Sequence, residues 1–182
     1  MSSNFSQCLA ALQSGEVIAY ATEAVYGLGC DPDNPSAVQQ ILDLKRRPIE
    51  KGVIVVAGEL QQLRSWVDID TLATAYPHVL ETWPGPHTWL VPCRLETPVY
   101  LTGRFNTLAV RVSEHPDIKR LCAALGKGIV STSANPSGEQ PARSAEQAKA
   151  YFPAVSALQG QVNPLAQPSV IRDAKTQAVI RN

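Results

Sequence analysis

Four cations fall within seven residues of this chain, at Lys45, Arg46, Arg47 and Lys51. The whole chain balances sixteen basic with sixteen acidic residues, so the cluster is a local feature. It stands between an expected helix and an expected buried strand at 53–57, and α/β proteins hold anionic ligands where helices meet a sheet edge. The alternative is a set of solvated charges at a helix C-terminus, each stabilising the helix by about 0.3–1 kcal/mol.

The position of Lys45 favours the first interpretation, in which the basic cluster binds an anion. With Asn34 as N-cap and Pro35 in the first turn, the spacing predicts a helix over 35–46. Its buried stripe contains Val38, Ile41, Leu42 and Lys45. A lysine on that stripe must reach solvent or meet an anion, because an unpaired buried charge costs several kcal/mol. Pro48 ends the helix, which leaves Arg47 on a basic turn.

Polar groups also lie on, or directly after, three other expected strands. The segment 22–31 places a hydroxyl, a carboxylate and two glycines after a strand at 17–21, which suits a ligand-facing loop, but it lacks a dinucleotide fingerprint. Alternation over 107–112 puts Leu108, Val110 and Val112 on a core face and Thr107, Ala109 and Arg111 on the other. A strand from 128 runs into a hydroxyl-rich loop, which suits phosphate or carboxylate; a turn satisfied by its own backbone is the alternative.

Strands and helices alternate along the chain with short connections. Further helices are expected at 5–12, 116–125 and 144–151, two short ones within 60–79, and further strands at 88–91, 154–158, 169–172 and 178–181. The segment 83–86 is interpreted as a packed corner, with an aromatic wall for a base as the alternative. The pattern predicts one α/β domain over 1–182, with a twisted mixed β-sheet flanked by helices.

Composition narrows the class of protein. No apolar run approaches the ~20 residues of a membrane span, and the polar start lacks a signal sequence, so a cytoplasmic location without membrane attachment is expected. Cys8, Cys30, Cys93 and Cys122 are scattered and should be reduced. No metal-ligand spacing is visible, so no protein metal site is expected. Net charge near zero weighs against a general nucleic-acid binder.

The ordered combination of motifs resembles a known family. The motifs are Thr22-Glu23-Ala24-Val25-Tyr26-Gly27-Leu28-Gly29, Lys45-x-Arg47, Ala109-Val110-Arg111-Val112 and Ser133-x-Asn135. Together they look like the YrdC-type threonylcarbamoyl-AMP synthases in their short bacterial form, over essentially the whole chain. The resemblance implies a YrdC-like fold with a concave ligand site. It also implies condensation of L-threonine, bicarbonate and ATP to threonylcarbamoyl-AMP and pyrophosphate, in the cytoplasm.

The implied product serves a tRNA modification. In the family, a partner transferase complex moves the threonylcarbamoyl group to adenosine 37 (t6A) of tRNAs reading codons that begin with A. Contact with tRNA would be indirect or weak. ATP would bring its own Mg²⁺ rather than use a dedicated protein site.

The resemblance also implies residue roles. Lys45, Arg47, Ser133 and Asn135 would form the catalytic tetrad. ATP would contact Arg47, Lys51, Thr107, Ser133, Arg143 and Arg181. Threonine would contact Thr22, Arg111, Ser131 and Ser169. Two departures are Ala24, where many relatives have a threonine that touches the amino acid, and Val56, where several have histidine.

Two other functions stay open at this point. One is an RNA-binding or ribosome-maturation module without catalysis, which would show steep salt dependence of RNA affinity and no ATP consumption. The other is a sister enzyme that makes a different carbamoyl adenylate, as a domain of hydrogenase-maturation proteins does. The lack of acylphosphatase-like or zinc-finger segments argues against this second reading.

Overall fold

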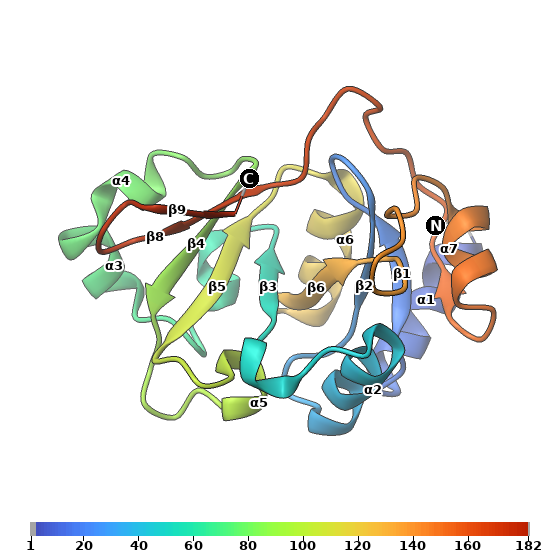
Figure 1. Cartoon of the computed structure of the whole chain (residues 1–182), viewed down its shortest axis with the longest axis horizontal. Helices are drawn as coiled ribbons and strands as arrows, with labels where there is room; N and C mark the ends of the chain where they lie inside the picture. The colour runs from blue at the N-terminus through green and yellow to red at the C-terminus, as the bar shows by residue number, and fades with distance from the viewer. Residues whose placement is uncertain (1–2, 182) are drawn as a thin grey trace.

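Nine strands form one mixed sheet in the computed structural model, which describes residues 3–181. Their order across the sheet is β7-β1-β2-β6-β3-β5-β4-β8-β9 (Figure 1). The pairs β1–β7, β3–β5 and β4–β8 are parallel and the others antiparallel, which confirms a mixed sheet. The strands are β1 (Ile18–Ala21), β2 (Tyr26–Gly29), β3 (Ile54–Ala57), β4 (His87–Pro92), β5 (Thr107–Val112), β6 (Ile129–Ser133), β7 (Ser156–Ala157), β8 (Val170–Asp173) and β9 (Val179–Arg181).

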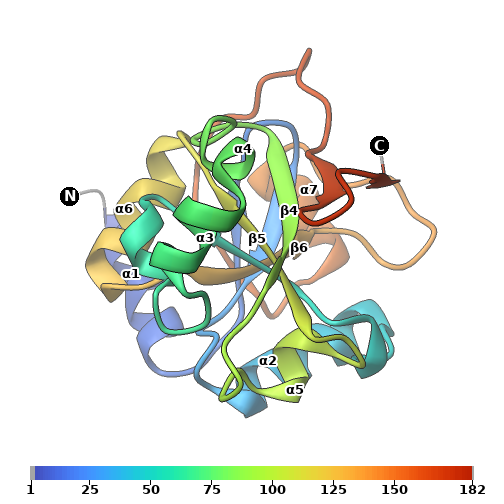
Figure 2. The same cartoon turned by 90° about the vertical axis from the view of Figure 1, so that its left-hand side faces the viewer.

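Helices surround this sheet. They are α1 (Ser3–Gln13), α2 (Pro35–Lys45), α3 (Ile69–Ala75), α4 (Pro77–Leu80), α5 (Val99–Thr102), α6 (Pro116–Leu125) and α7 (Ala145–Tyr151), with 3₁₀ turns η1 (Ile49–Lys51) and η2 (Leu60–Leu63). Figure 2 shows α1 and α6 side by side on one face of the sheet, with α2 and α5 together at its lower end. No helix within residues 3–181 is long and apolar enough to cross a membrane.

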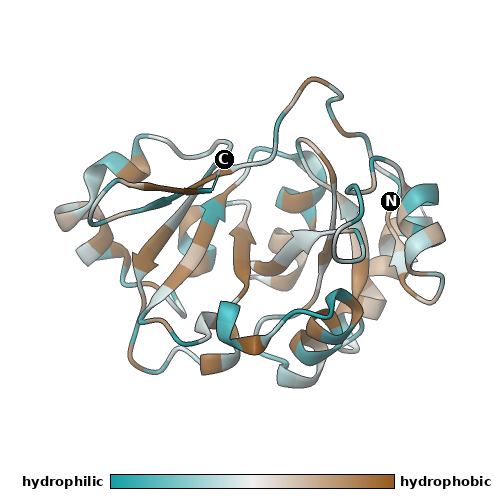
Figure 3. Cartoon of the chain, viewed as in Figure 1, coloured by the Kyte–Doolittle hydropathy of each residue, from teal (hydrophilic) through white to brown (hydrophobic). Residues whose placement is uncertain are grey.

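The two faces of the central strands have different environments. On β5, Leu108, Val110 and Val112 enter the larger hydrophobic core, whereas Thr107, Ala109 and Arg111 face the other way, as predicted. Figure 3 shows the apolar character of β3 and β4 beside the more polar outer helices. A second apolar cluster under α1 and α6 covers only one end of the opposite face. The uncovered end is where the candidate site lies.

Helix α2 delivers the basic turn as the sequence predicts. Asn34 Oδ1 accepts a hydrogen bond from the Ala37 amide at 3.1 Å, which caps the helix. The helix ends at Lys45, and Arg46 takes the left-handed conformation with φ of 47°. This single turn separates Lys45, which is buried, from Arg47, which lines a cavity.

Some expectations about the elements were wrong. The segment 22–31 is not one ligand-facing loop, because β2 occupies Tyr26–Gly29 and only residues 22–25 form a turn. Gly29 serves packing, since a Cβ there would meet the Tyr20 ring at 2.6 Å and the Val130 carbonyl at 2.8 Å. The segment 60–79 holds three short elements rather than two, and α5 was not expected. Trp83 packs against the core at the 83–86 corner.

A long connection, residues 159–169, arches over one side of the sheet between β7 and β8 (Figure 1). We call it the strap. The Tyr26 hydroxyl donates to the Gly160 carbonyl at 2.9 Å and accepts from its amide at 3.0 Å. The backbone amide of Asn163 donates to the backbone carbonyl of Glu23 at 2.8 Å. These bonds hold the strap against the turn at residues 22–25.

Candidate active site

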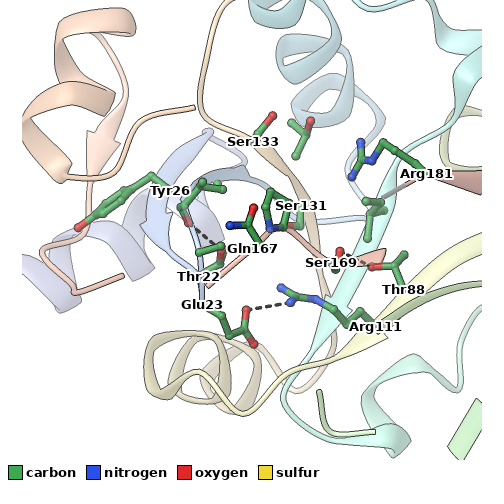
Figure 4. A pocket seen from close by; sticks show the side chains of 16 residues that line it. Thr22, Glu23, Tyr26, Thr88, Arg111, Ser131, Ser133, Gln167, Ser169 and Arg181 are labelled. Atoms are coloured by element: carbon green, nitrogen blue, oxygen red, sulfur yellow. Dashed lines mark hydrogen bonds and ion pairs between the residues drawn. The ribbon is translucent and has the colours of Figure 1, made fainter. Parts of the chain in front are cut away.

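Two adjoining cavities lie at the uncovered end of the sheet face opposite the larger hydrophobic core. The larger has a volume of about 590 Å³, within the range of small-molecule sites. The smaller has a volume of about 100 Å³ and is shown in Figure 4. Both are lined by Ile54, Ser131, Thr132 and Arg181. Ligands in the two cavities would therefore meet at this shared wall.

Sheet register builds the floor of the larger cavity. The pairs Leu90–Ala109, Ala109–Ile54 and Ile54–Ser131 form a row across β4, β5, β3 and β6. All four residues line the larger cavity. The hydroxyl of Ser131 thus stands at one end of an otherwise apolar row, which suits a ligand with an apolar ring and a polar tail.

Positive charge dominates the larger cavity. Arg47, Lys51 and Arg181 line it, and none of its described lining residues is acidic. Arg47 is fixed by its Nε, which donates to the Gly52 carbonyl at 3.0 Å. Burial lowers the pKa of the Arg47 guanidinium, and the charge of Arg181 lowers it further. Two guanidinium groups that repel each other across a cavity are stabilised when an anion binds between them.

Lys45 lies beneath the cavities rather than in their walls. Its Nζ donates to the carbonyl oxygens of Ser133 at 2.6 Å and Asn135 at 2.7 Å, and to Asn135 Oδ1 at 2.9 Å. An ammonium group has three N–H donors, which these three shortest contacts use; Ser133 Oγ lies further away, at 3.3 Å from Nζ. Burial, and to a lesser extent the charge of Arg47, lowers the pKa of Lys45 to about 8. Lys45 therefore organises the Ser133–Asn135 turn, whose Ser133 lines the smaller cavity.

The smaller cavity contains an ion pair. Arg111 Nη1 lies 2.8 Å from Glu23 Oε2, and Ser113 Oγ donates to Glu23 Oε1 at 2.5 Å. Burial alone would raise the pKa of Glu23, but the Arg111 charge and the Ser113 hydrogen bond outweigh it and lower that pKa. Glu23 is the only side-chain partner of Arg111 within residues 3–181. The other N–H groups of Arg111 can bind a carboxylate.

Hydroxyl groups add to the polarity of the smaller cavity, which Gln167 and Arg181 also line. Thr88 Oγ1 and Ser169 Oγ lie 2.8 Å apart (Figure 4). Thr22 Oγ1 donates to the Val25 carbonyl at 2.7 Å, which closes the turn. Thr88 and Glu23 were not among the site residues predicted from sequence. Thr88 stands in an apolar strand, and only the pairing of β4 with β5 brings it beside Arg111.

The structure gathers most of the predicted site residues. Arg47, Lys51, Thr107 and Arg181 line the larger cavity, and Thr22, Arg111, Ser131, Ser133 and Ser169 line the smaller one, with Ser131 and Arg181 shared. Lys45 and Asn135 lie behind them. Arg143 is not brought to either cavity. Its Nη1 donates to the Pro164 carbonyl at 2.9 Å and so holds the strap.

This fold and site define an α/β protein with a cationic, partly apolar cavity beside a smaller polar cavity. The family model Sua5/YciO/YrdC, described as "Telomere recombination", matches residues 10–182. The chain belongs to this family.

Close relatives carry one name. A threonylcarbamoyl-AMP synthase of Xanthomonas euvesicatoria is 50% identical over 185 residues, covering 98% of this chain and 97% of the relative. A threonylcarbamoyl-AMP synthase of Vibrio campbellii is 45% identical over 181 residues, covering 98% of each chain.

Two solved structures are similar in fold. P. abyssi Sua5 complexed with L-threonine has a TM-score of 0.79 at 26% identity, covering 93% of this chain and 50% of that one. E. coli YciO has a TM-score of 0.79 at 24% identity, covering 98% of this chain and 88% of that one.

Proposed function

We propose that the chain is an L-threonylcarbamoyl-AMP synthase, which condenses L-threonine, bicarbonate and ATP to threonylcarbamoyl-AMP and pyrophosphate. The observation that carries this proposal is the wall shared by the two cavities. One cavity suits a nucleotide and the other an amino acid, so a bond between the two ligands must form at that wall. Relatives at 45–50% identity bear the name of this activity.

The smaller cavity would hold L-threonine. Its carboxylate would pair with the free N–H groups of Arg111, which Glu23 keeps in orientation. Its amino group would then point to the shared wall and Ser131. There it attacks the carbon of bicarbonate, and loss of water leaves a carbamate. The Thr22 hydroxyl closes the turn that forms part of this cavity.

The larger cavity would hold ATP. A carbamate oxygen attacks the α-phosphorus, the bond from that phosphorus to the bridging oxygen breaks, and pyrophosphate leaves with the electron pair. Negative charge grows on the departing phosphates, where Arg47, Lys51 and Arg181 provide fixed positive charge. Because no described lining residue is acidic, we propose that Mg²⁺ enters with the phosphates rather than on a protein site.

The remaining roles follow from these positions. We propose that Thr107, which lines the larger cavity, contacts the nucleotide, and that Ser133 reaches it from the smaller cavity, next to the shared-wall residue Thr132. Lys45 and Asn135 would hold the turn behind Ser133. The product would pass to a threonylcarbamoyl-transferase complex for t6A modification of tRNA in the cytoplasm. Arg143 would act on the nucleotide only if the strap releases it.

The test is pyrophosphate release from ATP by the purified chain, with L-threonine and bicarbonate each added or omitted. We expect release only when both are present. Arg47→Met should lower kcat/KM by about 10²–10³, as for loss of one preorganised donor. Lys175→Met removes an exposed cation outside both cavities and should leave the rate unchanged. Absence of release in every combination would favour a non-catalytic RNA-binding module instead.

A further inference from the structure

The smaller cavity contains a hydroxyl pair, Thr88 and Ser169. The family resemblance implies that Ser169 contacts L-threonine, but it gives Thr88 no role. Both residues line that cavity, and Thr88 is fully buried. Their oxygens lie 2.8 Å apart, and neither side chain has another hydrogen-bond partner within the described residues 3–181. Figure 4 shows the pair between Arg111 and Arg181.

Strand register places Thr88 beside Arg111. The antiparallel pairs Trp89–Val110 and Leu90–Ala109 bring Thr88 level with Arg111 at the next position. On the other side of β5, Arg111 is paired with Val56, which is buried in the apolar cluster under α6. A ligand held by Arg111 therefore meets the Thr88 hydroxyl on the β4 side, whereas on the β3 side the residue that lines the cavity is the aliphatic Ile54.

The other hydroxyls of the smaller cavity are already engaged or lie elsewhere. Thr22 donates to the Val25 carbonyl. Ser133 Oγ accepts from Lys45 Nζ at 3.3 Å, and the proposed function assigns its hydroxyl to the nucleotide. Ser131 and Thr132 belong to the wall shared with the larger cavity, where the proposed function places the substrate amino group. Ala24, also in the lining, offers only a methyl group. Among the hydroxyl groups of this cavity, those of Thr88 and Ser169 remain to contact the substrate side chain.

The two hydroxyl groups have the hydrogen-bonding capacity to bind an alcohol. Two hydroxyl groups carry two protons, and the bond between them uses one. One proton and several lone pairs stay available, so the pair can donate one hydrogen bond and accept another. An alcohol on the substrate does the same. A substrate without a hydroxyl would leave the free proton of a buried pair without a partner, which costs binding energy.

We propose that Thr88, together with Ser169, selects the side-chain hydroxyl of the amino-acid substrate. This inference rests on the proposed function, because it assigns the wall that distinguishes L-threonine from amino acids of similar size. Discrimination arises from the unpaired hydroxyl that the wrong substrate leaves behind, which rejects an analogue more strongly than a missing methyl group does.

The experiment measures kcat/KM for pyrophosphate release with three amino acids. L-Threonine has the hydroxyl and the methyl group, L-2-aminobutyrate lacks the hydroxyl, and L-serine lacks the methyl group. Thr88→Val keeps the shape of the side chain and removes its hydroxyl. We expect it to lower the ratio of L-threonine to L-2-aminobutyrate by about tenfold. The ratio of L-threonine to L-serine should stay unchanged, because both carry the hydroxyl.

Three further variants complete the design. Ser169→Ala should lower the same ratio as Thr88→Val, and Thr88→Ser should keep it, since the hydroxyl remains. Thr97→Val is the matched control, because the buried Thr97 hydroxyl donates to the Trp66 carbonyl at 3.1 Å outside both cavities. It should leave both ratios unchanged.

The outcomes separate the two proposals. If Thr88→Val and Ser169→Ala lower the rates with all three amino acids equally, Thr88 has only a structural role and the inference is wrong, while the synthase function stands. If the unaltered chain releases no pyrophosphate with L-threonine, both fall. Should Thr88→Val fail to fold, Ser169→Ala and Thr88→Ser still decide the question.

Discussion

Glu23 holds the guanidinium of Arg111 through an ion pair of 2.8 Å, in which the side chains are 25% and 9% exposed. Ser113, which is fully buried, fixes the second oxygen of the same carboxylate. Both oxygens of Glu23 are thus held by protein partners, and Glu23 acts as a positioning residue for Arg111. Its contribution is the orientation of the Arg111 groups that face the smaller cavity.

Removing the Glu23 charge should weaken binding of the amino acid more than catalysis. In Glu23→Gln, Arg111 loses its charged partner and samples other orientations, so the KM for L-threonine should rise by about tenfold. The KM for ATP should change little, because Glu23 does not line the larger cavity. Steady-state kinetics with each substrate varied checks this. An equal rise in both KM values would contradict the positioning role.

The same ion pair predicts a dependence of stability on pH. The pKa of Glu23 is lowered from its ordinary value of 4.5. A carboxyl group of this kind stabilises the fold fully above its unfolded pKa, and the contribution is lost as pH falls through the lower folded value. The free energy of unfolding of the unaltered chain should thus exceed that of Glu23→Gln at neutral pH, and the difference should shrink below about pH 4.5. Urea denaturation across this range measures it.

Lys45→Ala should reduce both stability and turnover. The sequence alone suggests an active-site lysine whose loss spares the fold, but the structure shows three buried acceptors that would lose their donor. We expect a loss of about 1–3 kcal/mol in the free energy of unfolding and about 2–4 kcal/mol in transition-state stabilisation.

Lys51→Ala is the matched control for Lys45→Ala. Lys51 is exposed and lines the larger cavity. Its loss should weaken ATP binding while changing the free energy of unfolding by no more than about 0.5 kcal/mol. Equal stability of the two variants in denaturant titrations would disprove the organising role of Lys45.

The pKa of Lys45, lowered from 10.5 to about 8, gives opposite trends for stability and activity. Between these values the unfolded chain binds more protons than the folded one, so the Lys45 contribution to stability rises with pH. Deprotonation meanwhile weakens its hold on the Ser133–Asn135 turn, so kcat/KM should fall above about pH 8. Lys45→Met should lack both trends. Comparison of the two proteins isolates Lys45 from other groups that titrate there.

Gly52→Ala should disturb the nucleotide cavity through the backbone. Gly52 has φ of +58°, and a Cβ there would lie 2.8 Å from the carbonyl oxygens of Leu101 and Thr102. We expect a loss of about 1–3 kcal/mol in stability, together with weaker ATP binding because the Gly52 carbonyl anchors Arg47. Gly126→Ala, at φ of +72° with no atom within 4 Å, is the control for strain alone.

Local patterns predicted the elements that carry the site. The Asn34 cap, the buried stripe ending at Lys45 and the alternation around Arg111 depend on neighbours in sequence, and the structure confirms them. Helix α6 was placed correctly at 116–125 for the same reason. These features are fixed by helical and strand periodicity, which the sequence displays directly.

Such local patterns could not predict the contacts between segments that are distant in the sequence. The partners of Lys45 are neutral carbonyl groups some ninety residues away rather than an anion, and nothing in the 45–51 segment specifies them. The position of Thr88 beside Arg111 depends on the register of two strands joined by α5. Arg143 looked like another cation for phosphate, yet the strap offers it a carbonyl.

The wall shared by the two cavities has a consequence for inhibition. A molecule that joins an amino acid to adenylate across Ser131 and Arg181 binds as one body and loses its rotational and translational freedom only once. Each half raises the effective concentration of the other at its subsite. A stable mimic of the acyl adenylate should therefore bind far more tightly than either fragment. The same gain in affinity should slow the release of the reaction product.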